Sequence, residues 1–196
     1  MHSPERGSDR RTLIADSAIG LVAAAGLRGL THRAVDGAAG LPAGSTSYYF
    51  RTRTALIGAC YQRLAELDLG DFDAGAPSVP PDRDAAAAAL AALLHRWLTT
   101  GRARQLARFE LSLEAARNAE LETEFHRAGQ GARALAAGIL AALGAARPEQ
   151  SAELLVAWTD GLLYDRLAGA LARSRPTPDL TELTSVTRRM IDAALK

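Results

Sequence analysis

The sequence is poor in the residues that support disulfides, strands and metal sites. It has a single cysteine, Cys60, among 196 residues, so no intrachain disulfide can form. β-branched residues are sparse, and no alternating apolar and polar run predicts a strand. The four histidines are scattered, and no metal-ligand spacing, glycine-rich phosphate loop or nucleophile elbow is present. We therefore expect neither an enzyme nor a bound metal or cofactor.

Long hydrophobic runs are also lacking. The most apolar stretch, residues 85–94, is far shorter than the ~20 residues that span a bilayer. The N-terminal residues 1–11 are polar and lack the apolar segment of a signal peptide. These two absences lead us to expect a cytoplasmic protein with no membrane partner.

Apolar residues at helical spacing are abundant instead. Hydrophobic residues make up 48% of the chain, and much of that share is alanine, which favours closely packed helices. The predicted fold class is all-α. The expected helices cover about 9–25, 32–39, a short segment after Pro42, 52–69, 82–99, 102–118, 120–143, 148–173 and a last helix opened by Thr177 or Asp179.

Residues 29–53 predict two short helices around a glycine turn. Thr31 can cap the first helix, because its hydroxyl can accept an unpaired N–H of the first turn. Gly40 suits the left-handed position that ends this helix, and Pro42 fits the first turn of the next one. The second helix is short and crowded with hydroxyl groups. This pattern is typical of a helix-turn-helix, whose second helix enters the major groove of DNA.

The same stretch resembles the DNA-binding domain of TetR-family (tetracycline-repressor-like) transcriptional regulators. The residues that carry the resemblance are Leu30-Thr31, Arg33, Ala39-Gly40-Leu41, Gly44-Ser45, Tyr48-Tyr49-Phe50 and Arg53. Asp36, Pro42 and Ser47 depart from the family's usual pattern. The resemblance implies a homodimer that binds double-stranded operator DNA and holds a small-molecule effector in a C-terminal domain.

Candidate DNA contacts lie in and just after the helix-turn-helix. Ser45 and Thr46 can reach phosphates or base edges, and a tyrosine combines an apolar ring with a hydroxyl. Arg33 can read a guanine or simply attract phosphate, and the sequence leaves both open. The resemblance implies that Thr31, Tyr48, Tyr49 and Arg53 mainly contact phosphates. The full predicted set is Thr31, Arg33, Pro42, Gly44, Ser45, Thr46, Tyr48, Tyr49 and Arg53.

Charge is distributed unevenly. Residues 1–53 contain seven arginines and four acidic residues, a surplus of +3, so the net charge of +1 leaves −2 for the remainder. A basic surplus at the helix-turn-helix fits phosphate binding, although without the motif it would be ordinary surface scatter. Residues 1–8 are expected to form a loose arm, and Arg6, Arg10 and Arg11 either lie along phosphates or stay in solvent.

These features predict an N-terminal three-helix DNA-binding domain and a C-terminal ligand-binding and dimerisation domain, about nine helices in all. The head covers residues 1–53, the helix at 52–69 is a connector, the glycine- and proline-rich residues 70–81 are a linker, and residues 82–196 form the second domain.

The second domain holds most of the remaining large rings. The resemblance implies an effector pocket in this domain, lined by rings and by carboxylates on the same helices, in which unpaired acids would select a polar or cationic group. Aromatics at helical spacing are equally the ordinary content of a core. The candidate pocket residues are Trp97, Phe109, Glu110, Trp158 and Asp165.

The last two helices carry more apolar surface than a core of this size needs. We expect them to form a four-helix bundle across a two-fold axis. The predicted interface residues are Leu163, Leu167, Leu183, Val186 and Met190.

The predicted function is a ligand-responsive, nucleoid-associated repressor that binds a near-palindromic operator as a homodimer and is released by a small molecule. Two alternatives stay open: an activator or co-repressor-dependent regulator of the same fold, and a helical small-molecule-binding protein or enzyme without DNA binding. The effector, the operator and the regulated genes cannot be read from the sequence.

Overall fold

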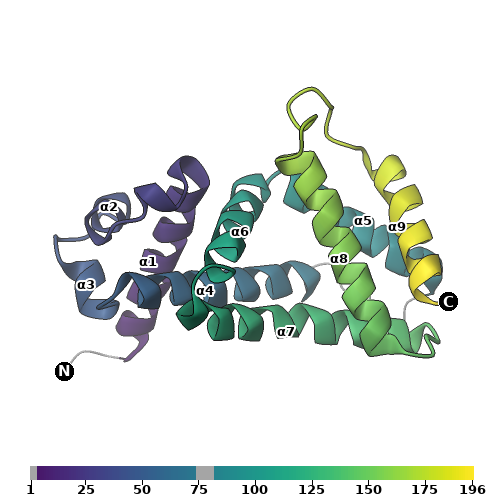
Figure 1. The fold of residues 1–196 in the computed structure, drawn as a ribbon, viewed down its shortest axis with the longest axis horizontal. Coiled ribbons are helices and arrows are strands. Elements are labelled where there is room, and N and C mark those ends of the chain that lie inside the picture. The colour runs from purple at the N-terminus through teal and green to yellow at the C-terminus, as the bar shows by residue number, and fades with distance from the viewer. Residues whose placement is uncertain (1–3, 74–81) are drawn as a thin grey trace. The chain divides into compact units, whose positions relative to one another are not determined.

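The computed structural model describes residues 4–73 and 82–196 (Figure 1). Over these two ranges it contains nine α-helices, one 3-10 turn and no strand, which confirms the all-α prediction. The elements are α1 (Pro4–Ala25), η1 (Leu27–Gly29), α2 (His32–Ala38), α3 (Ser45–Tyr49), α4 (Arg53–Asp73), α5 (Arg83–Leu98), α6 (Arg102–Ala115), α7 (Ala119–Ala142), α8 (Pro148–Leu167) and α9 (Leu180–Ala194).

Most helix ends follow local signals in the sequence. Gly26 and Gly40 follow α1 and α2 with φ of 64° and 62°, the left-handed conformation that glycine adopts most easily. Helices α4, α5 and α9 are capped by side chains that accept a hydrogen bond from the backbone N–H three residues later. The capping residues are Thr52, Asp82 and Asp179, and the bonds measure 3.0, 2.7 and 2.8 Å. Of the two residues expected to open α9, the structure therefore selects Asp179.

Helix α1 starts earlier than expected. It begins at Pro4, so residues 4–8 are helical and the loose arm predicted for residues 1–8 is wrong over this part. Residues 1–3 lie outside the described residues.

Two helices end elsewhere than expected. Helix α4 continues past residue 69 to Asp73, because the side chain of Asp71 is held by hydrogen bonds to α5 and α6. Helix α8 ends at Leu167 rather than near residue 173. A Cβ on Gly169 would lie 2.5 Å from the Asp165 carbonyl oxygen, so the chain turns there in a way open only to glycine.

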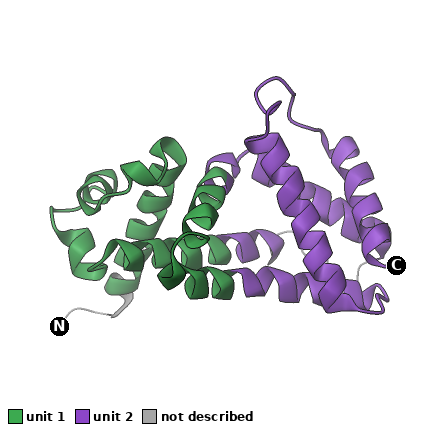
Figure 2. Cartoon of the chain, in the orientation of Figure 1, with its two compact units in different colours: residues 1–66, 106–128 green, residues 67–105, 129–196 purple. Residues whose placement is uncertain are grey.

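The chain divides into two compact units (Figure 2). Unit 1 comprises residues 1–66 and 106–128, and unit 2 comprises residues 67–105 and 129–196. Helices α4, α6 and α7 each contribute residues to both units. These units are defined by contacts, and their boundaries differ from those of the head, linker and second domain that the sequence predicted. The sequence-based division concerns function and stays a prediction. The predicted linker lies outside the described residues from position 74 to 81.

Unit 1 has one apolar core, to which the three N-terminal helices contribute together with α4, α6 and α7. Its most buried members include Ile14, Ala18, Val22, Leu30, Val35, Leu56, Ile57, Cys60, Leu111 and Leu121. The hydroxyl of Tyr61 donates to the Leu111 carbonyl oxygen at 2.9 Å, which ties α4 to α6 inside this core. Cys60 is a free cysteine buried in this core, where it acts as a packing residue.

Unit 2 is built around the contact of α5 with α9. The buried α5 residues at this contact are Ala86 and Ala87, packed against Ile191, and their small side chains allow the two helix axes to come close. The buried Thr187 hydroxyl donates to the Ala87 carbonyl oxygen at 2.7 Å. Helix α8 contacts both α5 and α9. Within the part of the chain that the structure describes, no helix is both long and apolar enough to cross a bilayer.

Candidate DNA-binding head and ligand site

Asp36 connects the two helices of the helix-turn-helix. Its side chain, at the end of α2, is 5% exposed. It accepts the backbone N–H of Gly44 at 2.8 Å, and the N–H and hydroxyl of Thr46 at 2.7 and 2.6 Å. Burial opposes ionisation, but these hydrogen bonds and the nearby His32 outweigh it, so the pKa of Asp36 lies below its ordinary value. The carboxylate anchors the start of α3.

Sequence reasoning marked Asp36 only as a departure from the family pattern and gave it no structural role. An acid eight residues before a glycine in a turn was the available signal, because a carboxylate there can cap the following helix. The same contact changes the interpretation of Thr46, which is 0% exposed. Its hydroxyl is turned inward, so we remove Thr46 from the set of side chains proposed to touch DNA.

Pro42 lies in the turn rather than in the second helix, which corrects the expected helix start. Gly44 has φ of 90°, and this left-handed conformation keeps the helix from starting earlier than Ser45. The N–H and hydroxyl of Ser45 both donate to the Pro42 carbonyl oxygen, at 3.1 and 2.6 Å. Glycine is thus required at position 44 by its backbone conformation.

The other predicted contact residues are mostly accessible. Tyr48 is 80% exposed, and its ring meets that of Tyr49 edge-on with centroids 5.1 Å apart. Thr31 caps α2 as predicted, accepting the Ala34 N–H at 3.1 Å. The exposed residues of the set also include Thr31, Arg33, Pro42 and Gly44. Two others, Ser45 and Tyr49, are half-buried.

The far end of α3 is held by two basic side chains. Arg11 donates to the Tyr49 carbonyl oxygen at 3.4 Å, and its guanidinium lies 5.6 and 5.3 Å from the ring centres of Tyr49 and Phe50. His32 Nε2 lies 2.7 Å from the Phe50 carbonyl oxygen. Arg11 therefore holds the C-terminal end of α3, a role that the sequence did not indicate.

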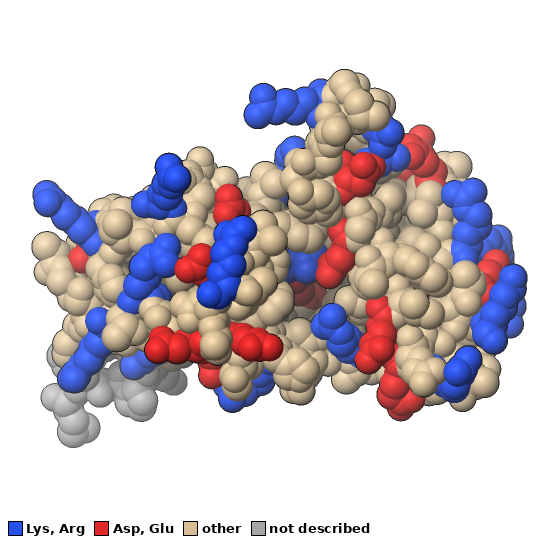
Figure 3. Space-filling view, viewed as in Figure 1, with Lys and Arg blue, Asp and Glu red and all other residues tan. Residues whose placement is uncertain are grey.

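Arg53 already has two partners inside unit 1. Its guanidinium donates to the Leu27 carbonyl oxygen at 2.9 Å and lies 3.5 Å from a carboxylate oxygen of Glu114. Its side chain is nevertheless 45% exposed. Around the end of unit 1 formed by α2 and α3, other basic side chains are visible on the surface (Figure 3).

The five predicted pocket residues do not form one group. Phe109 and Glu110 belong to unit 1, and Trp97, Trp158 and Asp165 belong to unit 2. Asp165 pairs with Arg175 at 2.9 Å, so it is not the unpaired acid that the pocket hypothesis needs. Trp97 is buried, and its indole N–H donates to Asp71 at 2.8 Å.

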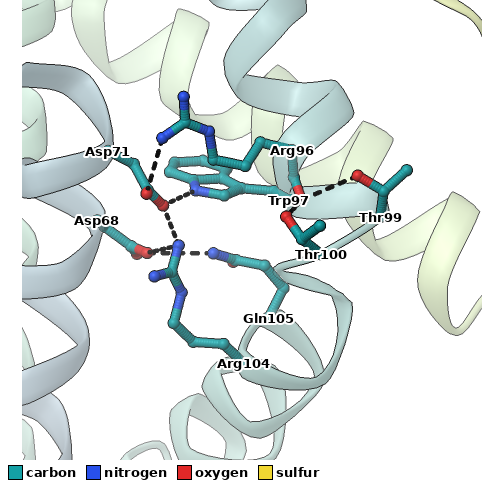
Figure 4. Close-up of polar contacts among 8 residues, drawn as sticks. All are labelled: Asp68, Asp71, Arg96, Trp97, Thr99, Thr100, Arg104 and Gln105. Carbon is teal, nitrogen blue, oxygen red and sulfur yellow. Dashed lines mark hydrogen bonds and ion pairs between the residues drawn. The ribbon is translucent and has the colours of Figure 1, made fainter. Parts of the chain in front are cut away.

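The contact of Trp97 belongs to a polar cluster that joins α4, α5 and α6 within unit 2 (Figure 4). Asp71 accepts hydrogen bonds from Arg96, Trp97 and Arg104. Asp68 accepts one from Gln105 at 3.2 Å and lies 3.4 Å from the Arg104 guanidinium.

Two arginines thus neutralise two aspartates in this cluster. Burial disfavours the charge on Asp71, but Trp97, Arg104 and Arg96 outweigh it, so the pKa of Asp71 is lowered. The sequence signal was weak, because Asp68 and Asp71 share one face of α4 but their partners are 25 or more residues away. A separate shallow groove of about 400 Å³ lies at the turn between α6 and α7 and contains none of the predicted pocket residues.

Residues 81–196 match the family profile described as "Tetracyclin repressor-like, C-terminal domain". This range is more than half of the chain. The protein belongs to the TetR family. No curated protein sequence matches it significantly.

Solved structures agree with this TetR assignment. The multidrug binding protein EbrR complexed with ethidium is 28% identical, with a TM-score of 0.73 over 95% of this chain and 99% of that one. A TetR-family member from Streptomyces coelicolor A3 is 26% identical, with a TM-score of 0.69 over 96% and 99% of the two chains. A putative TetR-family regulator from Rhodococcus sp., 20% identical with a TM-score of 0.76 over 96% and 100%, shows the fold alone.

The predicted dimer residues of this TetR protein lie mostly inside unit 2. Leu163, Leu167 and Leu183 are 0–3% exposed, so they pack within the chain and cannot meet a second copy. Val186 and Met190 are half-buried. For Leu163 and Leu167 the prediction failed because α8 is apolar on two sides, and periodicity alone does not show which side faces inward. Leu183 lies on α9, where it faces the core of unit 2.

The outward side of α8 carries a different apolar stripe. Leu154, Trp158 and Tyr164 are 51%, 37% and 50% exposed. Ala157 and Gly161 are exposed between them. The spacing of these five residues follows one face of a helix, so α8 presents an apolar surface that the described residues leave exposed. We call it the α8 stripe.

Proposed function

We propose that this TetR-family protein is a ligand-responsive transcriptional repressor that binds a near-palindromic operator and is released by a small molecule. The observation that carries the proposal is the outward face of α3. Tyr48 is 80% exposed on a helix of only five residues whose two ends are held from inside. Among the described residues the ring of Tyr48 meets that of Tyr49 and is otherwise largely in solvent, whereas a major groove offers both phosphates and thymine methyl groups.

The proposed contacts follow from accessibility. Eight of the nine predicted residues are retained as proposed DNA contacts, and Thr46 is removed. The retained residues are Thr31, Arg33, Pro42, Gly44, Ser45, Tyr48, Tyr49 and Arg53. Tyr48 and Tyr49 place hydroxyl groups toward phosphates, which positions the head without specifying sequence. Arg33 is exposed and is paired with no described residue, so its guanidinium is free to read a guanine edge. A regulator of this kind acts on the chromosome, so a nucleoid location in the cytoplasm is part of the proposal.

Binding to duplex DNA tests this proposal directly. An operator is selected from random duplexes, and dissociation constants are then measured at several salt concentrations. Tyr48→Ala should weaken binding about equally on all operator variants, whereas Arg33→Ala should relax the preference at one base pair. Arg117→Ala, an exposed arginine at the turn between α6 and α7, serves as the control and should bind as the wild type does. A wild-type protein that shows no salt-dependent affinity for any duplex contradicts the proposal.

The effector in this proposal is an aromatic small molecule. Support comes from EbrR, 28–29% identical to this chain, which has been crystallised with ethidium and with proflavin. Of the predicted pocket residues, Trp97 is retained, because its ring meets that of Phe72 at 5.9 Å and forms an apolar surface in unit 2. Phe109 and Glu110 remain candidates without a defined cavity, and Trp158 is assigned to the α8 stripe instead.

Adding ethidium or proflavin to the protein–operator complex tests the effector class. Release of the DNA supports repression with induction, and tighter DNA binding supports the co-repressor alternative. A coupling of ~1–3 kcal/mol would appear as an affinity change of about 5- to 150-fold. No change with either dye contradicts the proposed effector class and leaves the DNA-binding proposal standing.

A homodimer is the third part of the proposal, and the α8 stripe is its support. Leu154, Trp158 and Tyr164 offer a contiguous apolar surface of the kind that two-fold related copies bury. Two heads can then meet successive major grooves about 34–36 Å apart. We propose the α8 stripe as the interface in place of Leu163, Leu167 and Leu183.

A further inference from the structure

Glu114 of α6 reaches the start of α4 within unit 1 and pairs with Arg53. One guanidinium nitrogen of Arg53 lies 3.5 Å from Glu114 Oε1, and another donates to the Leu27 carbonyl oxygen at 2.9 Å. The side chain of Glu114 is 26% exposed and that of Arg53 is 45% exposed. Arg53 follows the recognition helix by a few residues, so an acid from α6 contacts a residue of the proposed DNA-binding set.

The position of Glu114 is fixed by the packing of α6. Leu111 and Ala115, on either side of Glu114 in the sequence, are 0% and 4% exposed in the core of unit 1. The Tyr61 hydroxyl bonds to the carbonyl oxygen of Leu111, less than one turn before Glu114. Because α6 is held in this register, Glu114 stays at the edge of the core beside Arg53.

A carboxylate and a phosphate compete for the same guanidinium donors. Both are anions, and arginine binds each through the parallel N–H groups of its planar fork. An Arg53 that is engaged by Glu114 and by the Leu27 carbonyl has fewer donors left for DNA. Separating Arg53 from Glu114 therefore has a free-energy cost that DNA binding must offset.

We propose that Glu114 is an internal competitor for operator phosphate, which lowers the DNA affinity of the head by holding Arg53. This inference rests on the proposed DNA-binding function. It assigns α6 a direct influence on the head through one ion pair, and it makes Glu114 a positioning residue that acts through Arg53.

A double-mutant cycle on DNA affinity tests the competition. Dissociation constants for the selected operator are measured for the wild type, Glu114→Gln, Arg53→Ala and the double variant. Exposed ion pairs are weak, so Glu114→Gln should bind DNA about two- to fivefold more tightly than the wild type. In the Arg53→Ala background the gain should fall to the small effect of removing any acid near DNA, because the competing guanidinium is gone.

A charge control is needed, because removing any acid reduces repulsion of DNA. Glu122→Gln makes the same change on α7 of unit 1, where the exposed Glu122 forms no ion pair with any described residue. Its gain in affinity should be smaller than that of Glu114→Gln. Thermal unfolding of each variant checks the fold, and Glu114→Ser serves as a second variant.

The possible results separate the two proposals. Equal gains from Glu114→Gln and Glu122→Gln, or a gain from Glu114→Gln that is undiminished in the Arg53→Ala background, overturn the competition. Weaker binding by Glu114→Gln also overturns it and shows that Glu114 orients Arg53 toward phosphate. If the wild type binds no duplex DNA, the proposed function fails and this inference fails with it.

Discussion

The carboxylate of Asp36 accepts hydrogen bonds from the hydroxyl and the backbone N–H of Thr46, at 2.6 and 2.7 Å, across the turn of the helix-turn-helix. An isolated helix of five residues is unstable in water, so α3 depends on such tertiary contacts for its position. Arg11 supplies the matching contact at the Tyr49 carbonyl oxygen. Helix α3 is therefore held at both ends by contacts within the chain.

Replacing Asp36 by Asn should lower the free energy of unfolding by about 1–3 kcal/mol at pH 7. Asparagine keeps the size but offers one acceptor oxygen to three donors, and it points an NH₂ group at one of them. Urea unfolding of the two proteins measures the difference. Asp9→Asn, on an exposed part of α1 with no described partner, is the control and should be neutral.

The same pair of proteins should show a pH dependence of defined sign. The pKa of Asp36 is lower in the folded state than its ordinary value of 3.8. The stabilisation by the ionised carboxylate is therefore present above this value and is lost as the pH falls through the folded pKa. The stability difference between the wild type and Asp36→Asn should shrink below about pH 4. A difference that stays constant from neutral to acid pH contradicts this assignment.

Cys60 should be unreactive in the folded protein. Burial, and to a smaller extent Asp16, raises the pKa of its thiol from 9.0 to about 12, which alone lowers the thiolate fraction about a thousandfold. The residue is also 0% exposed. Absorbance with a chromogenic disulfide reagent should show slow reaction in buffer and rapid, stoichiometric reaction in urea. Fast labelling of the native protein would show that the core of unit 1 opens readily.

The sequence predicted the features whose causes are local. Thr31 caps a helix through the N–H group three residues away, and Gly40 ends a helix because of its own backbone conformation. The contacts of Asp36 and Arg11 were not predicted, because they depend on how α2 and α1 pack against α3. The outward side of α8 could not be identified either, since Leu163 inside and Trp158 outside are equally apolar in the sequence.

Arg104 and Arg96 bind the same carboxylate from different environments, and their removal should have different costs. Arg104 is 18% exposed beside Asp71, whereas Arg96 is 43% exposed. Arg104→Ala leaves Asp68 and Asp71 with an uncompensated partly buried charge and should cost about 3 kcal/mol of stability. Arg96→Ala should cost less than about 1 kcal/mol. Equal costs in chemical unfolding would show that solvent screens the whole cluster.

The α8 stripe predicts how the protein assembles. Leu154 is 51% exposed on this stripe. Leu154→Glu should give folded monomers, because dimer formation would then bury an unpaired carboxylate. Leu113 on α6 is also 51% exposed, so Leu113→Glu is a control of the same residue type and accessibility and should assemble as the wild type does. Leu183→Glu should instead unfold unit 2, because Leu183 is 1% exposed inside it.

Light scattering gives the mass of each variant at micromolar concentration, and circular dichroism reports whether it is folded. We expect two chains for the wild type and Leu113→Glu, and one chain for Leu154→Glu. The monomer should also bind operator far more weakly, because one head has only half of the phosphate contacts of a dimer. A monomeric wild type, or a Leu154→Glu protein that still assembles, would rule out the α8 stripe as the dimer interface.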